Sequence, residues 1–273
     1  MQMSIGSNIK AFREDRKLTQ EQVAEALGIS FQAVSSWERD EYKPDTDKLI
    51  RLAEVLGVSV SALVEEKHKF FKTKETIYDW EHMKTYVKTT ARNLKLPNTL
   101  RAVDFAVKAH EGQNRKRSTT PYIYHPLNLA CHALSMDIHE DEIIAACLLH
   151  DVVEDCKIGV NDLPVNEETK ELVRLLTCEK TNDENRHEII SRYYKEIMTN
   201  PKAALIKCMD RCNNLTTMSW GLSRERIYRM IKETDEFYPG LLQVIKNTTE
   251  YNNAAWLLKY QIESMLDIYK RLL

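Results

Sequence analysis

The sequence predicts an all-α protein with two domains. Its 273 residues include only seven glycines and seven prolines, and long stretches repeat apolar residues at the 3.6-residue spacing of amphipathic helices. A chain of this length suggests one or two domains, and a hydrophobic content of 43% is enough for a core of ordinary size. We expect a five-helix domain at residues 1–66, a helical linker at 67–89 and a helical domain at 90–273.

The charge distribution, the cysteines and the apolar runs indicate where in the cell the protein is expected. The formal net charge is −2, but acidic side chains are in excess over residues 1–66 and basic ones over residues 67–120. The six cysteines form no CxxC pair, so we expect free thiols in a reducing compartment. No apolar run reaches the length of a membrane span, and none lies near the start, which predicts a cytoplasmic protein without a signal peptide.

The first domain is expected to contain a helix, a tight turn and a second helix. Thr19 and Gln22 match a capping box that opens the helix QEQVAEAL, and Gly28 ends that helix. Ser30 is a suitable N-cap for the next helix, FQAVSSWERD, and a later helix, DKLIRLAEVL, ends at Gly57. Two helices around a tight turn form a helix-turn-helix.

Residues 6–65 closely resemble the Cro/C1-type (XRE) DNA-binding domain, through the stretch TQEQVAEALGISFQAVSSWERDEYKPDTDKLIRLAEVLGVSVSALV. The resemblance implies a DNA operator as partner and a homodimer that reads paired half-sites. The residues that it places toward DNA are Gln20, Gln22, Phe31, Gln32, Ser35 and Ser36. The acidic charge of this domain favours the alternative, a head that binds a protein partner, because DNA phosphates are contacted by Lys and Arg.

The stretch LLHDVVED places four ionisable groups at the end of an apolar run. On one helix over residues 140–155, His150 and Glu154 would share a face, and Asp151 and Asp155 would share the neighbouring face. His150 and Asp151 would project about 100° apart, close enough to bind one metal ion together. The sequence therefore predicts a polar edge beside an apolar stripe.

Two other segments supply polar residues that suit the same edge. His125 belongs to a His-Pro pair, which is expected at the entrance of a helix. Asp210, Asn214 and Thr217 have the spacing i, i+4, i+7 on a helix that begins near Pro201, so they form one polar stripe. The candidate metal ligands are His125, His150, Asp151 and Asp210. Each alone has an ordinary explanation as a turn or surface residue, but two imidazoles and two carboxylates together suit Mn²⁺, Fe²⁺, Zn²⁺ or Mg²⁺.

The order of these residues is that of the HD phosphohydrolase superfamily. The segments AHEGQNRKRSTTPYIYHPLNLA, LLHDVVED and PKAALIKCMDRCNNL resemble, more specifically, the hydrolase domain of RelA/SpoT-type alarmone enzymes. The resemblance implies one Mn²⁺ or other divalent metal at the four ligands, and hydrolysis of the 3′-pyrophosphate of ppGpp or pppGpp to GDP or GTP plus pyrophosphate. It also implies that Glu154 and Asp155 position and activate the attacking water. The nucleotide would be held by Arg115, Lys116, Asn214 and Thr217.

One loop departs from the family pattern. The family has R-K-S-G-x-P-Y, whereas the segment Arg115 to Tyr122 is one residue longer and lacks the glycine. This leaves open an HD hydrolase of another pyrophosphorylated nucleotide, such as an adenosine alarmone. A further alternative is a transcription regulator that senses an alarmone. The presence of Glu154 and Asp155 favours turnover, because binding alone needs no activated water.

Overall fold

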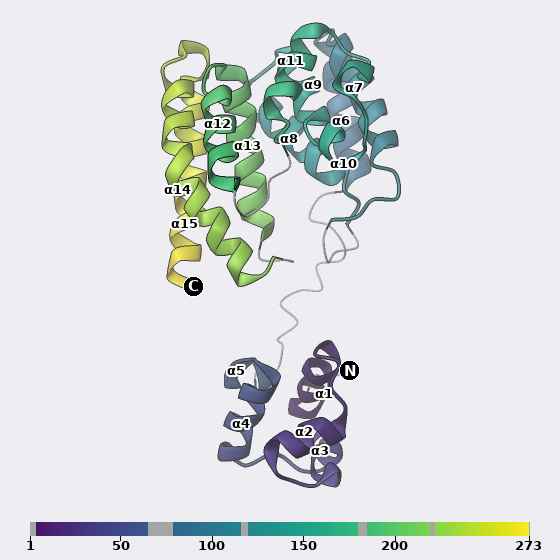
Figure 1. Ribbon diagram of the computed structural model, residues 1–273. Helices are drawn as coiled ribbons and strands as arrows, with labels where there is room; N and C mark the ends of the chain where they lie inside the picture. The colour runs from purple at the N-terminus through teal and green to yellow at the C-terminus, as the bar shows by residue number, and fades with distance from the viewer. Residues whose placement is uncertain (1–3, 65–78, 116–119, 180–184, 219–221, 273) are drawn as a thin grey trace. The chain divides into compact units, whose positions relative to one another are not determined.

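The computed structural model describes residues 4–64, 79–115, 120–179, 185–218 and 222–272. Over these residues the regular structure is helical, apart from one isolated bridge between Asn114 and Pro121, which confirms the all-α prediction. The chain divides into two compact units, Met1–Ile77 and Tyr78–Leu273, each with its own hydrophobic core (Figure 1).

The first unit has the five short helices that the sequence predicts. They are α1 (Ile5–Asp15), α2 (Gln20–Leu27), α3 (Phe31–Glu38), α4 (Thr46–Leu56) and α5 (Val60–Val64). Thr19 and Gln22 form the expected capping box of α2, and Gly28 ends this helix at a φ of +67°, a conformation that favours glycine. At the start of α3, the Ser30 hydroxyl accepts a hydrogen bond from the Ala33 amide. Helices α2 and α3 therefore form a helix-turn-helix.

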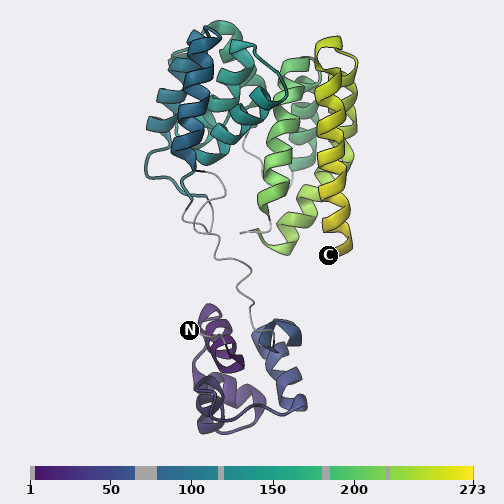
Figure 2. The ribbon, with the colours of Figure 1, turned by 180° about the vertical axis from the view of Figure 1, so that it is seen from behind.

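The second unit is built from longer helices in two groups. They are α6 (Trp80–Asn93), α7 (Pro97–Ala109), α8 (Tyr124–Ser135), α9 (Asp141–Leu149), α10 (Val152–Asp155), α11 (Glu167–Leu176), α12 (Arg186–Ile197), α13 (Pro201–Thr217), α14 (Arg224–Lys246) and α15 (Asn252–Leu272). Helices α6 to α11 gather on one side and α12 to α15 on the other, as the two opposite views show (Figures 1 and 2). Helix α13 packs against α8, α9 and α11 as well as α14 and α15, so it joins the two groups.

Helix α9 lies at the centre of its group and is apolar on every side. It packs against α7, α8, α11 and α13, and every residue from Ile143 to Leu149 is buried. A helix that is hydrophobic all round is typical of a core position. The first polar residues that follow this helix, His150 and Asp151, therefore emerge directly from the core.

The prediction of one continuous helix over residues 140–155 was wrong. Helix α9 ends at Leu149, His150 and Asp151 form a turn, and a separate short helix, α10, follows. The reason lies in the His150 ring, whose Nδ1–H donates to the Cys147 carbonyl at 2.9 Å. A continuous helix would direct the Asp151 amide at that carbonyl, so the side chain competes with the backbone ladder.

Helix α6 belongs to the second unit. It begins at Trp80, and the Asp79 carboxylate caps it by accepting hydrogen bonds from the amides of Glu81 and His82. It packs against α7 and α8, so residues 80–89 of the stretch expected as a linker lie on this unit. The remainder of that stretch, residues 67–78, is outside the described residues.

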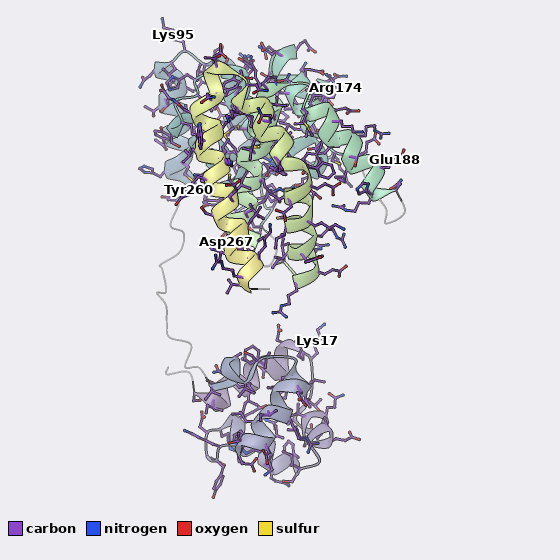
Figure 3. All side chains as sticks on the ribbon, turned by 90° about the vertical axis from the view of Figure 1, so that its left-hand side faces the viewer. Lys17, Lys95, Arg174, Glu188, Tyr260 and Asp267 are labelled. Atoms are coloured by element: carbon purple, nitrogen blue, oxygen red, sulfur yellow. The ribbon has the colours of Figure 1, made fainter. Side chains whose placement is uncertain are left out.

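The outer surface of α15 carries a row of exposed apolar and aromatic side chains. Trp256, Tyr260, Ile268 and Leu272 follow one another at multiples of four residues, and Figure 3 labels Tyr260 on this helix. Within this row, Trp256 and Tyr260 are neighbours on the helix surface, and so are Ile268 and Leu272, because each pair is four residues apart. Among the described residues, no helix is both long and apolar enough to cross a membrane.

Candidate functional site

The four predicted metal ligands come from three elements that meet at one point. His125 lies in the first turn of α8, His150 and Asp151 form the turn after α9, and Asp210 lies in the middle of α13. His125, His150 and Asp210 are buried, whereas Asp151 is partly exposed. The buried central helix and the bridging helix α13 thus bring residues 85 positions apart in the sequence to one site.

The donor atoms of this cluster are within coordination reach of one another. His125 Nε2 is 3.2 Å from His150 Nε2, 3.2 Å from Asp210 Oδ1 and 3.4 Å from Asp151 Oδ2. His150 Nε2 is 3.2 Å from Asp151 Oδ1 and 3.9 Å from Asp210 Oδ1. The arrangement offers two imidazole nitrogens and two carboxylate oxygens to a single centre.

Hydrogen bonds fix the tautomers of both histidines. Because a carbonyl only accepts, His150 Nδ1 must carry the proton that it shares with Cys147. Asn213 donates its amide Nδ2–H to Asn128 at 2.8 Å, so its Oδ1 faces His125 and accepts the His125 Nδ1–H. In the neutral rings both Nε2 atoms then present lone pairs toward each other, which a cation between them stabilises.

Charge at the cluster also favours a cation. Burial lowers the pKa of His150, but the carboxylates of Asp151 and Asp210 more than offset burial and raise this pKa to about 9. The cluster therefore attracts positive charge strongly, whether a proton or a metal ion supplies it. Nitrogen and carboxylate donors fit a first-row divalent ion, so the residues present can hold a divalent metal.

Three residues that the sequence analysis did not single out support the ligands. The Tyr122 hydroxyl donates to Asp151 Oδ2 at 2.7 Å, and Lys207 Nζ lies 3.0 Å from Asp210 Oδ2. Asn213, described above, orients His125. Each is three residues from a ligand in sequence, Tyr122 before His125 and the other two on either side of Asp210. Helical i±3 spacing would have indicated only Lys207, which contacts Asp210 on the same helix. Tyr122 and Asn213 contact ligands on other elements.

The two predicted catalytic carboxylates follow the ligands on α10. Glu154 and Asp155 are exposed to solvent, and Glu154 Oε1 accepts a hydrogen bond from the Cys178 amide at 2.6 Å. Although solvent reaches Glu154, desolvation by the surrounding protein raises the pKa of its carboxyl. The Cys178 amide and the charge of Lys207 oppose this rise, and the nearby Asp151 and Asp155 carboxylates add to it.

The predicted nucleotide-binding residues differ in what they contact: Arg115 and Thr217 contact each other, whereas Asn214 contacts a candidate metal ligand. Arg115 donates through Nη2 to Thr217 Oγ1 at 2.8 Å, and its guanidinium carbon lies 6.0 Å from the centre of the Tyr122 ring. Asn214 instead donates to Asp210 Oδ1 at 2.6 Å, so it contacts a candidate metal ligand. Lys116 lies outside the described residues.

The predicted DNA-binding residues of the first unit differ in what they already contact. Gln20 donates to Glu38 at 2.7 Å, and Gln22 is used by the capping box of α2. The Ser36 hydroxyl donates to the Ala33 carbonyl, and Ser35 accepts from Arg39. Two side chains at the first turn of α3 are exposed, Phe31 and Gln32.

Comparisons with known proteins agree with this division of the chain. The family model of the helix-turn-helix matches residues 9–63, and 86 residues are 38% identical to the immunity repressor protein of Bacillus phage phi105, covering 32% of this chain and 59% of that protein. A guanosine-3′,5′-bis(diphosphate) 3′-pyrophosphohydrolase of Aquifex aeolicus is 32% identical over 170 residues, 59% of this chain and 23% of that enzyme. The chain thus spans about a quarter of that relative.

The fold of the second unit also occurs in a solved structure, described as a metazoan ortholog of SpoT that hydrolyzes ppGpp. The similarity covers 62% of this chain and 94% of that one, with a TM-score of 0.50 and 22% sequence identity, and it supports the fold alone. The family model of the HD domain matches residues 102–241, which include all four candidate ligands. By this match over half of its length, the chain belongs to the HD-domain family.

Proposed function

We propose that this protein is a metal-dependent hydrolase that removes the 3′-pyrophosphate of ppGpp or pppGpp, giving GDP or GTP plus pyrophosphate. The observation that carries the proposal is the cluster of His125, His150, Asp151 and Asp210, whose two imidazole Nε2 atoms converge with two carboxylates beside Glu154. The Aquifex relative, 32% identical over 170 residues, is named for this reaction, and its name supports the choice.

The proposed cofactor is one Mn²⁺ ion, held by these four ligands. Bound there, the ion would polarise phosphate oxygens and lower the pKa of a bound water. Tyr122, Asn213 and Lys207 would keep the ligands in their orientations, since each contacts a ligand directly.

Protein side chains would carry out proton transfer, orientation of the attacking water and nucleotide binding. Glu154, whose pKa is raised, is the proposed general base that accepts a proton from the attacking water, and Asp155 orients that water. Arg115 and Thr217, which already contact each other, would bind the nucleotide together with Lys116 and Asn214. The guanidinium of Arg115 suits phosphate recognition, because it offers two parallel N–H donors.

We propose a DNA operator as the partner of the first unit and a homodimer as the binding form. The exposed Phe31 and Gln32 at the first turn of α3 support this proposal, because the N-terminal residues of a recognition helix reach the base edges. The similarity to a phage repressor supports it as well.

A second candidate substrate is another pyrophosphorylated nucleotide, such as an adenosine alarmone. The observation that favours it is the loop from Arg115 to Pro121, which departs from the family pattern. Its ends are joined by the bridge between Asn114 and Pro121 and by a hydrogen bond from the Arg115 amide to the Thr120 carbonyl, at 2.9 Å. The loop therefore begins at a fixed base next to the Arg115 side chain.

The first test is pyrophosphate release from ppGpp by the purified chain with Mn²⁺, next to an Asp151→Ala control. We expect turnover that the control lacks. A protein that binds Mn²⁺ but leaves ppGpp intact would overturn the assignment of ppGpp. Adenosine alarmones in the same assay then test the second candidate, and tight ppGpp binding without turnover would indicate a sensor.

A further inference from the structure

Lys207 occupies a position in the site that neither metal ligation nor nucleotide binding explains. It lies one turn before Asp210 on α13, and its Nζ is 3.0 Å from Asp210 Oδ2. The other oxygen of that carboxylate, Oδ1, faces His125 at 3.2 Å. The two oxygens of Asp210 are thus divided, one toward the cluster and one toward the ammonium group.

The Lys207 side chain is held in place from several sides. Its exposed fraction is 17%, and its Nζ lies 5.4 Å from the centre of the Tyr193 ring, within the range of a cation–π interaction. The backbone of Lys207 is held as well, because the Tyr238 hydroxyl donates to its carbonyl at 3.5 Å. A lysine on a flexible four-carbon stem acts as a fixed charge only when its surroundings restrict it, and these contacts do so.

The same ammonium group also acts on the proposed general base. Desolvation raises the pKa of Glu154, and the charges of Asp151 and Asp155 raise it further. Against these stand the backbone amide of Cys178, which donates to the carboxylate, and the positive charge of Lys207. Lys207 is therefore the positively charged side chain from α13 that acts both on a ligand and on the base.

We propose that Lys207 is a positioning residue of the candidate metal site, which holds Asp210 so that Oδ1 faces a bound metal. Its effect on the pH profile of turnover is a consequence that rests on the proposed function, whereas its effect on metal binding does not. Removing the ammonium group would free Asp210 Oδ2 and leave that buried carboxylate without its ion pair. It would also raise the pKa of Glu154, which the charge of Lys207 lowers.

The test compares Lys207→Met with Lys207→Arg in the full chain. Mn²⁺ binding is measured by calorimetry, and kcat for ppGpp is measured across pH. We expect Lys207→Met to weaken Mn²⁺ binding by about tenfold or more, the range seen when a group that orients a ligand is lost. In Lys207→Met, the fall of kcat at acidic pH should begin at a higher pH than in the wild type. Lys207→Arg should restore in part both the Mn²⁺ affinity and the position of this acidic limb.

Lys202 supplies the matched control, because it lies on the same helix and its ammonium group pairs with Glu142 and Glu168 away from the cluster. Lys202→Met should leave the Mn²⁺ affinity and the acidic limb unchanged. If Lys207→Met reduces folding by circular dichroism, Lys207→Gln provides the same comparison.

The outcomes separate this inference from the proposed function. A folded Lys207→Met protein with wild-type Mn²⁺ affinity and an unmoved acidic limb would overturn the inference, even if ppGpp is hydrolysed. A wild type inactive on ppGpp, together with weakened Mn²⁺ binding in Lys207→Met, would overturn the proposed substrate and support the role of Lys207 at Asp210.

Discussion

The Nε2 atoms of His125 and His150 lie 3.2 Å apart, and each ring uses its other nitrogen to donate a hydrogen bond, to Asn213 and to Cys147. Two lone pairs at this distance repel each other unless positive charge lies between them. The two neighbouring carboxylates, Asp151 and Asp210, add negative charge to the same point. The cluster is therefore most stable with a cation bound, so metal binding and folding stability of this unit should be linked.

Addition of Mn²⁺ should raise the thermal stability of the second unit. A ligand present at one hundred times its dissociation constant stabilises the folded state by about 2.7 kcal/mol, if it does not bind the unfolded chain. His150→Ala removes one donor and should abolish most of this gain, and EDTA should reverse it in the wild type. Thermal unfolding followed by circular dichroism measures the shift. An equal Mn²⁺ effect in His150→Ala would contradict the assigned site.

The contact between Asn213 and His125 should govern metal affinity. Asn213→Leu removes the acceptor that fixes the His125 tautomer, and we expect Mn²⁺ binding to weaken by about 10- to 100-fold. Asn213→Asp keeps an acceptor oxygen of similar size, so it should bind Mn²⁺ more tightly than Asn213→Leu. Calorimetric titration of both variants tests this. Equal affinities would mean that Asn213 fills space and does not orient the ring.

The raised pKa of Glu154 predicts the direction of the pH dependence. A general base must be unprotonated, so turnover should fall as pH decreases through the pKa of Glu154. Because this pKa is raised, the fall should occur at higher pH than for an ordinary glutamate. Glu154→Gln should lower kcat by about 10²- to 10⁴-fold, the usual contribution of general base catalysis. Profiles of kcat at saturating Mn²⁺ provide the measurement.

Asp155→Asn is the comparison for that experiment, because it alters the neighbouring carboxylate on the same short helix. If Asp155 orients water, its loss should reduce kcat while an acidic limb remains. A limb that disappears in Asp155→Asn and persists in Glu154→Gln would exchange the two roles.

Exposed residues at the first turn of α3 should decide whether the head binds a specific DNA sequence. Gln32→Ala should weaken binding to an operator selected from random DNA by about 1–3 kcal/mol, the value of a good contact to a base edge. Its thermal unfolding should not change, because this side chain is exposed. Fluorescence anisotropy measures the affinity. A selection that enriches no DNA would favour the protein-partner alternative for the head.

Sequence patterns predicted the residues of the candidate site because they belong to local motifs. The capping residues Thr19 and Ser30 and the turn at Gly28 could also be predicted, since each depends on neighbouring backbone atoms. The break after α9 could not, because it arises from competition between the His150 ring and the Asp151 amide for one carbonyl. Periodicity counts apolar residues and does not contain such side-chain bonds.

The contacts between distant elements were harder to predict. Arg115 and Thr217 are 102 residues apart, and no local signal pairs their side chains. Asn214 is predicted to contact the nucleotide, and no sequence pattern indicates that its amide also donates to Asp210. A polar stripe on a helix indicates which residues share a side, but the partner that each one meets depends on the packing of α13 against α8 and α9.

The ion pair between buried Arg211 and partly exposed Glu233 should contribute strongly to the stability of the second unit. Arg211 Nη2 lies 2.6 Å from Glu233 Oε1 and 2.9 Å from the Tyr194 hydroxyl. The contact with Glu233 joins α13 to α14. Glu233→Ala leaves a buried guanidinium without its counter-ion, which typically costs about 3–5 kcal/mol. Urea unfolding followed by circular dichroism measures the loss. Glu236→Ala, on the same helix, breaks an exposed pair with His187 and should cost about 0–1 kcal/mol.

Acid should remove the same stabilisation. Burial raises the pKa of Glu233, but the Arg211 guanidinium and the Tyr194 hydroxyl more than offset burial and lower it. A carboxyl whose pKa is lower in the folded state stabilises the protein above its unfolded pKa, and this contribution is lost as pH falls through the folded value. The difference in unfolding free energy between wild type and Glu233→Ala should therefore shrink in acid. A constant difference from neutral pH into acid would show that packing, and not the ion pair, sets the effect.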